Sequence, residues 1–399
     1  MSELQPASRR VLGLTLLLYL CGAAALAQRD TQSPGLPFSG ANYWQRPLAP
    51  QGAPPADWTK LEQSLVPADC GRCHVDQFQQ WRSSRHAHAF SPGLVGQLLT
   101  FDAASIAQCL QCHAPLAEQL ADFETQRAQG IAQISQGLAE AGNGCGGCHL
   151  RHHQHFGPPQ RGTGATGVSQ MTAPHGGVVR TALFESSEFC SACHQFPADL
   201  AVNGKPLENT YAEWKVSPQA QQGMTCQSCH MPDRQHLWRG IHDPAMVTAG
   251  LTARTWVDDV GAHFEIANTG TGHAFPTYAV PRIVMHAVAL DNEGQAKRTT
   301  EQLQVIARIV RYQTGKWIEI SDTRLMPGQT ANLAIAWNGS DRVRVWLEVI
   351  PDYYYQTDVF PNLLETLPAG SAAAQLIAQA KLEAATSPFT LFETELRRP

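Results

Sequence analysis

Five cysteine pairs in this sequence share one pattern, in which two residues separate the cysteines and a histidine directly follows the second. Thiols at this spacing can add across the two vinyl groups of a haem, and the adjacent imidazole is then held under the iron as its proximal ligand. Spacing and residue type are therefore one chemical requirement. The five copies are Cys70-Cys73-His74, Cys109-Cys112-His113, Cys145-Cys148-His149, Cys190-Cys193-His194 and Cys226-Cys229-His230.

A pair of cysteines at this spacing has other uses, because it can form a redox dithiol, a disulfide or half of a zinc site. None of these needs the trailing histidine, and zinc ribbons use such pairs two at a time. The chain has 16 histidines among 399 residues. Chance would place one after all five pairs about once in ten million sequences. The sequence therefore predicts five covalently bound c-type haems, with iron as the metal.

The second axial ligand of each iron decides whether the protein is an electron carrier or an enzyme. A haem with histidine on both faces has no open position for a substrate. Eleven histidines remain after the five proximal ones, which is more than five distal positions need. His263 and His286 lie within alternating strand patterns, so we interpret them as structural residues. Methionine is the less favoured ligand, although Met231 directly follows the fifth motif.

The first 27 residues predict a signal peptide and therefore an exported, periplasmic location. Arg9 and Arg10 precede an apolar run that ends in the small-residue pattern Ala25-Leu26-Ala27, as in secretory signals. The run is short for a membrane span, and an uncleaved anchor is the alternative. We expect no stable membrane span after cleavage. Cys21, the one cysteine outside the five motifs, belongs to this segment.

The motifs follow one another at intervals of 39, 36, 45 and 36 residues. This spacing predicts one loop-rich, mainly helical domain at 67–250 in which the haems replace a conventional apolar core. Residues 28–66 contain six prolines and predict a linker. Apolar residues at three- and four-residue steps predict a helix or helical pair between the second and third motifs. They are Leu116, Leu120, Phe123, Ile131, Ile134 and Leu138.

After about residue 250 the apolar pattern changes to alternation, which is typical of strands joined by turns. In 343–349 every second residue is Val or Leu, while Arg344 and Glu348 face the other way. We expect an immunoglobulin-like β-sandwich at 251–366. A C-terminal helix at 372–385 and a tail complete the last segment, 367–399. The fold class is thus α+β, a pentahaem cytochrome c domain followed by a β-sandwich.

Several segments resemble the multihaem cytochromes c related to cytochrome c-554, an electron carrier of hydroxylamine oxidation. They are WRSSRHAHAF, GCGGCHLRHHQH, SSEFCSACHQF, TYAEWKVSPQAQQGMTCQSCHMP and RQHLWRGIHDP. PHGG and GTGHAFPT are similar to the wider group. The chain departs from the tetrahaem cytochrome that names the family by its fifth motif and its β-domain. Family members include one with an open haem, so the resemblance leaves both a carrier and an enzyme in view.

The resemblance also implies a set of distal ligands. His88 is the alternative to His86, and His152 and His153 are register alternatives to His155. The ranked distal ligands are His86, His155, His175, His236 and His242, with His273 as the sixth.

Charged residues make up 16% of the chain, below the roughly 25% of an average soluble protein, which argues against nucleic acid as a partner. Loss of residues 1–27 takes the net charge from -5 to -6. Ten propionates and five ferric irons would bring it to about -11, so we expect a redox partner with a basic patch.

The sequence as a whole predicts a periplasmic electron carrier. It would link a membrane or soluble donor, such as a quinol-linked protein, to a terminal acceptor or reductase. The alternative is a multihaem oxidoreductase that acts on a small nitrogen or sulfur compound at one five-coordinate haem. Multihaem nitrite reductases often use an attachment motif that ends in lysine, and this chain has none.

Overall fold

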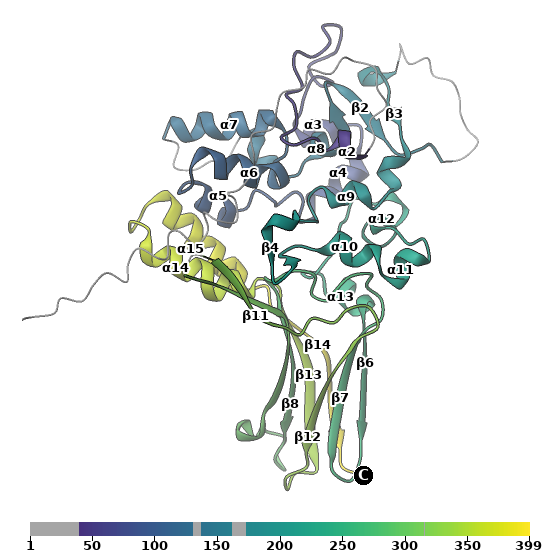
Figure 1. Ribbon diagram of the computed structural model, residues 1–399, viewed down its shortest axis with the longest axis vertical. Coiled ribbons are helices and arrows are strands. Elements are labelled where there is room, and N and C mark those ends of the chain that lie inside the picture. The colour runs from purple at the N-terminus through teal and green to yellow at the C-terminus, as the bar shows by residue number, and fades with distance from the viewer. Residues whose placement is uncertain (1–39, 131–136, 162–172, 315) are drawn as a thin grey trace, which may run out of the picture. The chain divides into compact units, whose positions relative to one another are not determined.

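A computed structural model describes residues 40–130, 137–161, 173–314 and 316–399 (Figure 1). The predicted signal peptide, Ile131 and Ile134 lie outside these residues. The described chain combines helices with several sheets, which confirms the α+β class. Among the helices described, none is both long and apolar enough to cross a bilayer.

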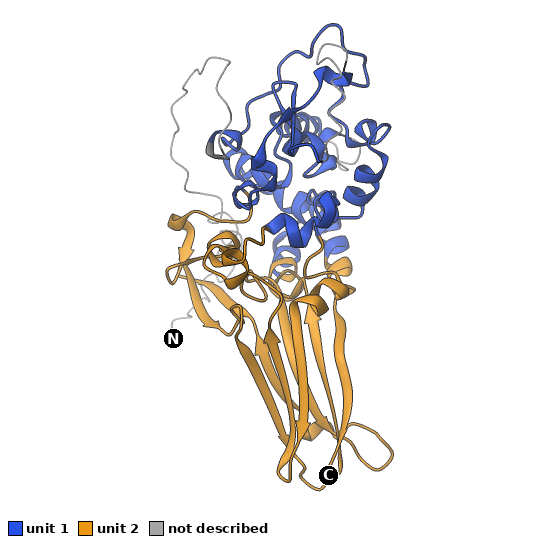
Figure 2. Ribbon diagram, turned by 90° about the vertical axis from the view of Figure 1, so that its right-hand side faces the viewer, with its two compact units in different colours: residues 1–192, 226–238, 362–380 blue, residues 193–225, 239–361, 381–399 orange. Residues whose placement is uncertain are grey.

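The chain divides into two compact units, which are coloured separately in Figure 2. Unit 1 comprises Met1–Ala192, Cys226–Trp238 and Asn362–Ala380. Unit 2 comprises Cys193–Thr225, Arg239–Pro361 and Lys381–Pro399. The division falls inside the fourth motif, between its two cysteines.

Unit 1 consists mainly of short helices joined by loops. A small sheet of β1 (Leu150–Arg151), β2 (Gln154–Gly157) and β3 (Val179–Arg180) follows the third motif. α14 (Phe360–Thr366) and α15 (Ala372–Ala385) belong to unit 1 in part, and the second has the bounds predicted from the sequence. The other helices are α2 (Gly40–Tyr43), α3 (Pro67–Cys70), α4 (Val75–Arg82), α5 (Pro92–Leu98), α6 (Ala103–His113), α7 (Ala117–Ala128), α8 (Cys145–His149), α9 (Glu188–Ser191) and α12 (Cys226–His230).

An apolar cluster of unit 1 forms where α5, α6 and α7 pack together. α5 and α6 begin at N-cap residues, because Ser91 and Asp102 accept hydrogen bonds from backbone amides of the first turn. α7 contains Phe123 of the predicted periodic segment, and that ring is fully buried. The cluster shows that unit 1 has apolar packing of its own around part of its helices. Its buried members include Phe90, Leu98, Phe101, Ile106, Leu110 and Phe123.

Unit 2 is built on two antiparallel sheets, with strand orders β12-β7-β6 and β14-β13-β8-β9. Figure 1 shows their long strands running alongside one another. The strands are β6 (Leu251–Val257), β7 (Gly261–Asn268), β8 (Arg282–Ala289), β9 (Gln302–Ile306), β12 (Thr330–Ala336), β13 (Arg342–Ile350) and β14 (Phe389–Arg397). Two ribbons, β4 (Ala201–Val202) with β5 (Lys205–Pro206) and β10 (Arg308–Gln313) with β11 (Lys316–Asp322), and the helices α10 (Thr210–Lys215), α11 (Pro218–Gln221) and α13 (Pro244–Gly250) complete the unit.

The two sheets share one hydrophobic core, which includes Phe264 of β7, Met285 of β8 and Val345 of β13. The predicted alternation along β13 is confirmed, because its four Val and Leu residues are fully buried while Arg344 and Glu348 are not. A sandwich of two sheets is therefore present, and its immunoglobulin-like connectivity stays a prediction.

The last strand differs from the sequence expectation. Residues 389–397, expected as a tail, form β14 and pair antiparallel with β13. The register shifts between Val345 and Leu347, and Phe392 has a φ of 53°. This irregularity interrupts the alternation that identifies a strand in the sequence.

Candidate functional site

All five motifs lie at short helical turns. α3 ends at Cys70, α6 ends at His113, and α9 contains Cys190. α8 and α12 each span a whole motif, from the first cysteine to the histidine. None of the ten motif cysteines forms a disulfide. Free thiols on adjacent helical positions are what thioether attachment of a haem requires.

Three proximal histidines have their ring orientation fixed through Nδ1. A hydrogen bond at Nδ1 leaves Nε2 as the nitrogen available to a metal, and such outer partners set the tautomer and the basicity of the ligand. Two of the acceptors are backbone carbonyls and one is a carboxylate. The contacts are His113 to Ala89 O at 2.9 Å, His149 to Phe156 O at 2.7 Å and His194 to Glu208 Oε1 at 3.0 Å.

Two proximal rings each lie near a predicted distal ring, at a centroid distance that suits two ligands of one iron. The ring centroids of His74 and His175 are 6.4 Å apart, and those of His149 and His236 are 6.2 Å apart. Two metal–nitrogen bonds of about 2 Å, each extended by about 1 Å to the ring centre, give about 6 Å. The residues at these two motifs therefore fit a haem held between two imidazoles.

Hydrogen bonds from the backbone anchor the two distal segments. The amide of His175 donates to Glu62 Oε1 at 2.8 Å, and hydrogen bonds from His175 and Thr59 lower the pKa of Glu62 to about 2. The amide of His236 donates to Gln80 Oε1 at 2.8 Å. Burial lowers the pKa of His236 to about 4, which keeps its ring in the neutral form that binds a metal.

His155 lies beside His175, since the two rings stack with centroids 4.0 Å apart. Burial and the neighbouring histidines lower the pKa of His155 to about 3. Of its register alternatives, His152 is exposed, and His153 has Nε2 within 3.0 Å of the carbonyl oxygen of Gly52. The structure thus places two predicted distal ligands side by side.

His86 is half-buried and contacts the ring of Trp238 edge-on at 4.7 Å, whereas its alternative His88 is exposed. The carbonyl of His86 accepts a hydrogen bond from the amide of Asn143, and Trp81 Nε1 donates to the carbonyl of Asn143. These bonds hold the segment in place. They make His86 the more enclosed of the two candidates.

The two candidates of unit 2 differ in which nitrogen is occupied. His242 has Nε2 3.0 Å from Asp352 Oδ2 and 3.1 Å from Asp352 Oδ1, so an iron at this nitrogen would have to displace the carboxylate. His273 has Nδ1 2.9 Å from the carbonyl oxygen of Ala274. Its ring is therefore held in the same manner as the proximal rings His113 and His149.

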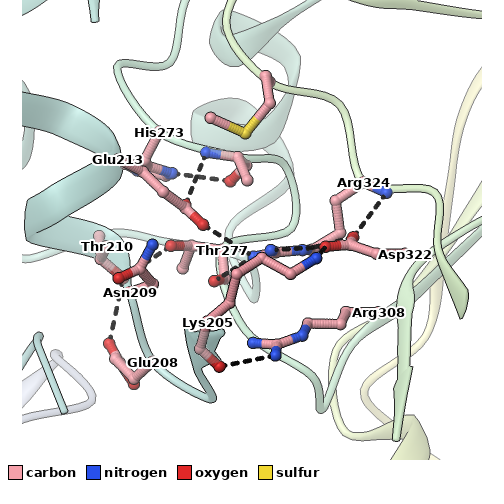
Figure 3. A network of polar contacts seen from close by, with 12 residues as sticks. Lys205, Glu208, Asn209, Thr210, Glu213, His273, Thr277, Arg308, Asp322 and Arg324 are labelled. Carbon is pink, nitrogen blue, oxygen red and sulfur yellow. Dashed lines mark hydrogen bonds and ion pairs between the residues drawn. The ribbon is translucent and has the colours of Figure 1, made fainter. Parts of the chain in front are cut away.

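A buried polar network supports the loop that carries His273 (Figure 3). Glu213 Oε2 accepts from the amide of Ala274 at 3.0 Å, and its Oε1 accepts from Arg324 Nη1 at 3.2 Å. Asn268 donates from Nδ2 to the carbonyl of His273 at 2.9 Å. Burial raises the pKa of Glu213. The network fixes the backbone on both sides of the imidazole.

The first and third motifs, which begin at Cys70 and Cys145, lie close together. α3 and α8, which carry these residues, pack against each other. Two cofactors attached at these thiols would be neighbours in unit 1.

Sequence reasoning missed the acceptors that orient the proximal rings. Ala89, Phe156 and Glu208 come from segments outside the motifs they serve. A carbonyl acceptor has no residue signature, because every residue offers one. Glu208 could have been noticed only as one acidic residue among the 34 of the chain.

Paired thiols at helical segments, proximal imidazoles held through Nδ1 and two closely spaced imidazole pairs are the features that attachment of several c-type haems requires. Residues 69–150, which span the first three motifs, match the family described as cytochrome c554 and c-prime. The resemblance inferred from the sequence is thus confirmed over these residues. A search of curated proteins found no match.

A solved structure has a similar fold. It is described as a penta-heme cytochrome c552 from Thermochromatium tepidum, and it matches with a TM-score of 0.59 at 19% sequence identity. The match covers 84% of this chain and 99% of the other. The likeness between the two chains is one of fold.

Proposed function

We propose that this chain is a periplasmic pentahaem electron carrier. It would pass electrons from a membrane-associated or soluble donor to a terminal acceptor or reductase. The observation that carries the proposal is the opposition of His74 to His175 and of His149 to His236 at the spacing of two axial ligands. Bound haem iron supplies one-electron exchange between its ferric and ferrous states. The five motifs and the printed description of the Thermochromatium tepidum structure support the count of five.

In the ligand set that we propose, His175 serves the first motif and His236 the third. His86, His155, His242 and His273 are the candidates for the second, fourth and fifth motifs. The enclosed position of His86 and the Nδ1 contact of His273 favour these two. Burial lowers the pKa values of His155 and His236, which keeps these two imidazoles neutral before a cofactor binds.

For the domain organisation we propose a signal peptide at 1–27, a linker at 28–66 and a haem-bearing region at 67–250. A β-sandwich at 251–366 would follow, with the segment 367–399 returning its last strand to the sheet. The shared core of the two sheets supports the sandwich, and the pairing of β14 with β13 supports the returning strand.

Mass and spin state test the proposal on the full-length protein secreted from a host that attaches c-type haem. We expect a mass increase of five haems over the polypeptide without residues 1–27. In the oxidised protein we expect five low-spin ferric signals and no change on adding nitrite or hydroxylamine, and in the reduced protein we expect no change on adding carbon monoxide. A colourless protein, or one without added mass, contradicts the proposal.

A second candidate function has a specific observation in its favour. The Nε2 of His242 is paired with Asp352, and the ring of His155 stacks on that of His175. If neither serves as a separate ligand, fewer than five distal histidines remain in the predicted set. One five-coordinate haem could then act on a small nitrogen or sulfur oxyanion. A high-spin ferric signal that changes on adding nitrite or hydroxylamine would favour this oxidoreductase.

A further inference from the structure

The fourth motif differs from the second and third in what its proximal histidine meets. His113 and His149 point Nδ1 at neutral backbone carbonyls, whereas His194 points Nδ1 at the Glu208 carboxylate, 3.0 Å away. We propose that Glu208 is a positioning residue that lowers the reduction potential of the haem on the fourth motif. This proposal rests on the proposed function, because it requires a haem at that motif.

The backbone of Glu208 is fixed from two sides. Its carbonyl accepts a hydrogen bond from the amide of Phe196 at 2.9 Å, and it forms an antiparallel bridge with Tyr278. Thr210 Oγ1 lies 3.3 Å from Glu208 Oε1 and 2.7 Å from Thr277 Oγ1 (Figure 3). The Glu208 side chain is 19% exposed. The carboxylate therefore has a defined position and little contact with water.

The segment after the fourth motif is joined to the segment around Glu208 by further hydrogen bonds. The amide of Tyr211 donates to the carbonyl of His194 at 3.3 Å. Gln195 Nε2 donates to Asn209 Oδ1 at 3.0 Å, and Gln195 Oε1 accepts from the amide of Ala212. These bonds flank the contact between imidazole and carboxylate, so that contact is part of an ordered arrangement.

The chemistry follows from the direction of the hydrogen bond. When Nδ1–H donates to a carboxylate, the ring gains electron density and Nε2 becomes a stronger donor to iron. A stronger donor stabilises the ferric state more than the ferrous state. Hydrogen bonds with an ionised partner are roughly twice as strong as neutral ones. We expect about a tenfold effect on the ferric-to-ferrous ratio at a fixed potential, which is about 59 mV for one electron.

The test compares the full-length holoprotein with three variants. Glu208→Gln keeps the shape and removes the charge, and Glu208→Asp keeps the charge with a shorter reach. Glu188→Gln is the matched control, because this substitution removes the same charge. Glu188 is exposed and lies two residues before Cys190. Mass spectrometry first counts the haems. A redox titration monitored by electron paramagnetic resonance then gives the midpoint potential and the g values of each haem.

We expect the midpoint potential of one of the five haems to rise by about 59 mV in Glu208→Gln. The g values should change for that haem alone. In Glu208→Asp the midpoint potential of the same haem should rise by less than half as much. In Glu188→Gln it should not change. If Glu208→Gln loses the haem on the fourth motif, a partial rise of the potential in Glu208→Asp still tests the role of Glu208. The proposal is overturned if no midpoint potential changes in Glu208→Gln. It is also overturned if the potential shifts equally in both Glu208 variants, or if the control shifts it by the same amount. A protein without haem would instead contradict the proposed function.

Discussion

Replacing His236 with alanine removes one imidazole from a pair whose other member stays in place. His149 remains anchored by its 2.7 Å contact with the Phe156 carbonyl, so its iron would keep one axial ligand. The lost ring lies 6.2 Å from the His149 ring, and an alanine methyl group cannot reach the iron between them. One haem of five should become high-spin, which is about a fifth of the ferric iron.

Electron paramagnetic resonance of the oxidised holoprotein measures this fraction directly. Visible spectra should gain a weak high-spin band, and mass spectrometry should still count five haems, because the cysteines are untouched. His263→Ala is the matched control. His263 stacks on Trp256 and pairs with Asp258 on the sandwich, so its loss should leave all five spectra unchanged.

His175→Ala gives an independent repeat at the first motif, opposite His74. We expect the same fraction of high-spin iron, and twice that fraction in the double variant. The reasoning from ring spacing is refuted if His236→Ala remains fully low-spin. It is equally refuted if the control and the ligand variant change alike.

Three further predictions concern other parts of the chain. His86→Ala should produce one high-spin haem with all five haems retained, whereas His88→Ala should leave the spectrum unchanged; identical spectra for both would reassign the ligand. Glu213→Ala should lower the free energy of unfolding by about 3 kcal/mol in denaturant titrations, because Arg324 is buried and keeps only Asp322 as a carboxylate partner. Reduction by a basic redox partner should slow as salt rises in stopped-flow experiments, and a salt-independent rate would contradict the acidic charge argument.

The attachment residues could be predicted because their chemistry is local. A haem needs two thiols and an imidazole within five consecutive residues, so Cys145, Cys148 and His149 carry the whole signal in α8. The β-strands with regular alternation were also predictable, as in β13. β14 was not, because the bulge at Phe392 breaks the pattern on which recognition depends.

Distal partners are a different problem, because the chain must fold before they meet. His74 and His175 come from distant segments, and so do His149 and His236. Sequence alone could rank histidines through the resemblance but could not match them to motifs. The stacking of His155 on His175 also shows that two candidates twenty residues apart in the sequence can be neighbours in the fold.

Cys70 and Cys145 lie on two helices, α3 and α8, that pack against each other, and this sets a condition on biogenesis. In an oxidising compartment, neighbouring thiols can cross-link. A disulfide between these two residues would consume one attachment group from each of two motifs. If the chain is exported as proposed, haem attachment has to come before oxidation of the two thiols, and a delay in cofactor supply would leave a product that must be reduced before it can be loaded.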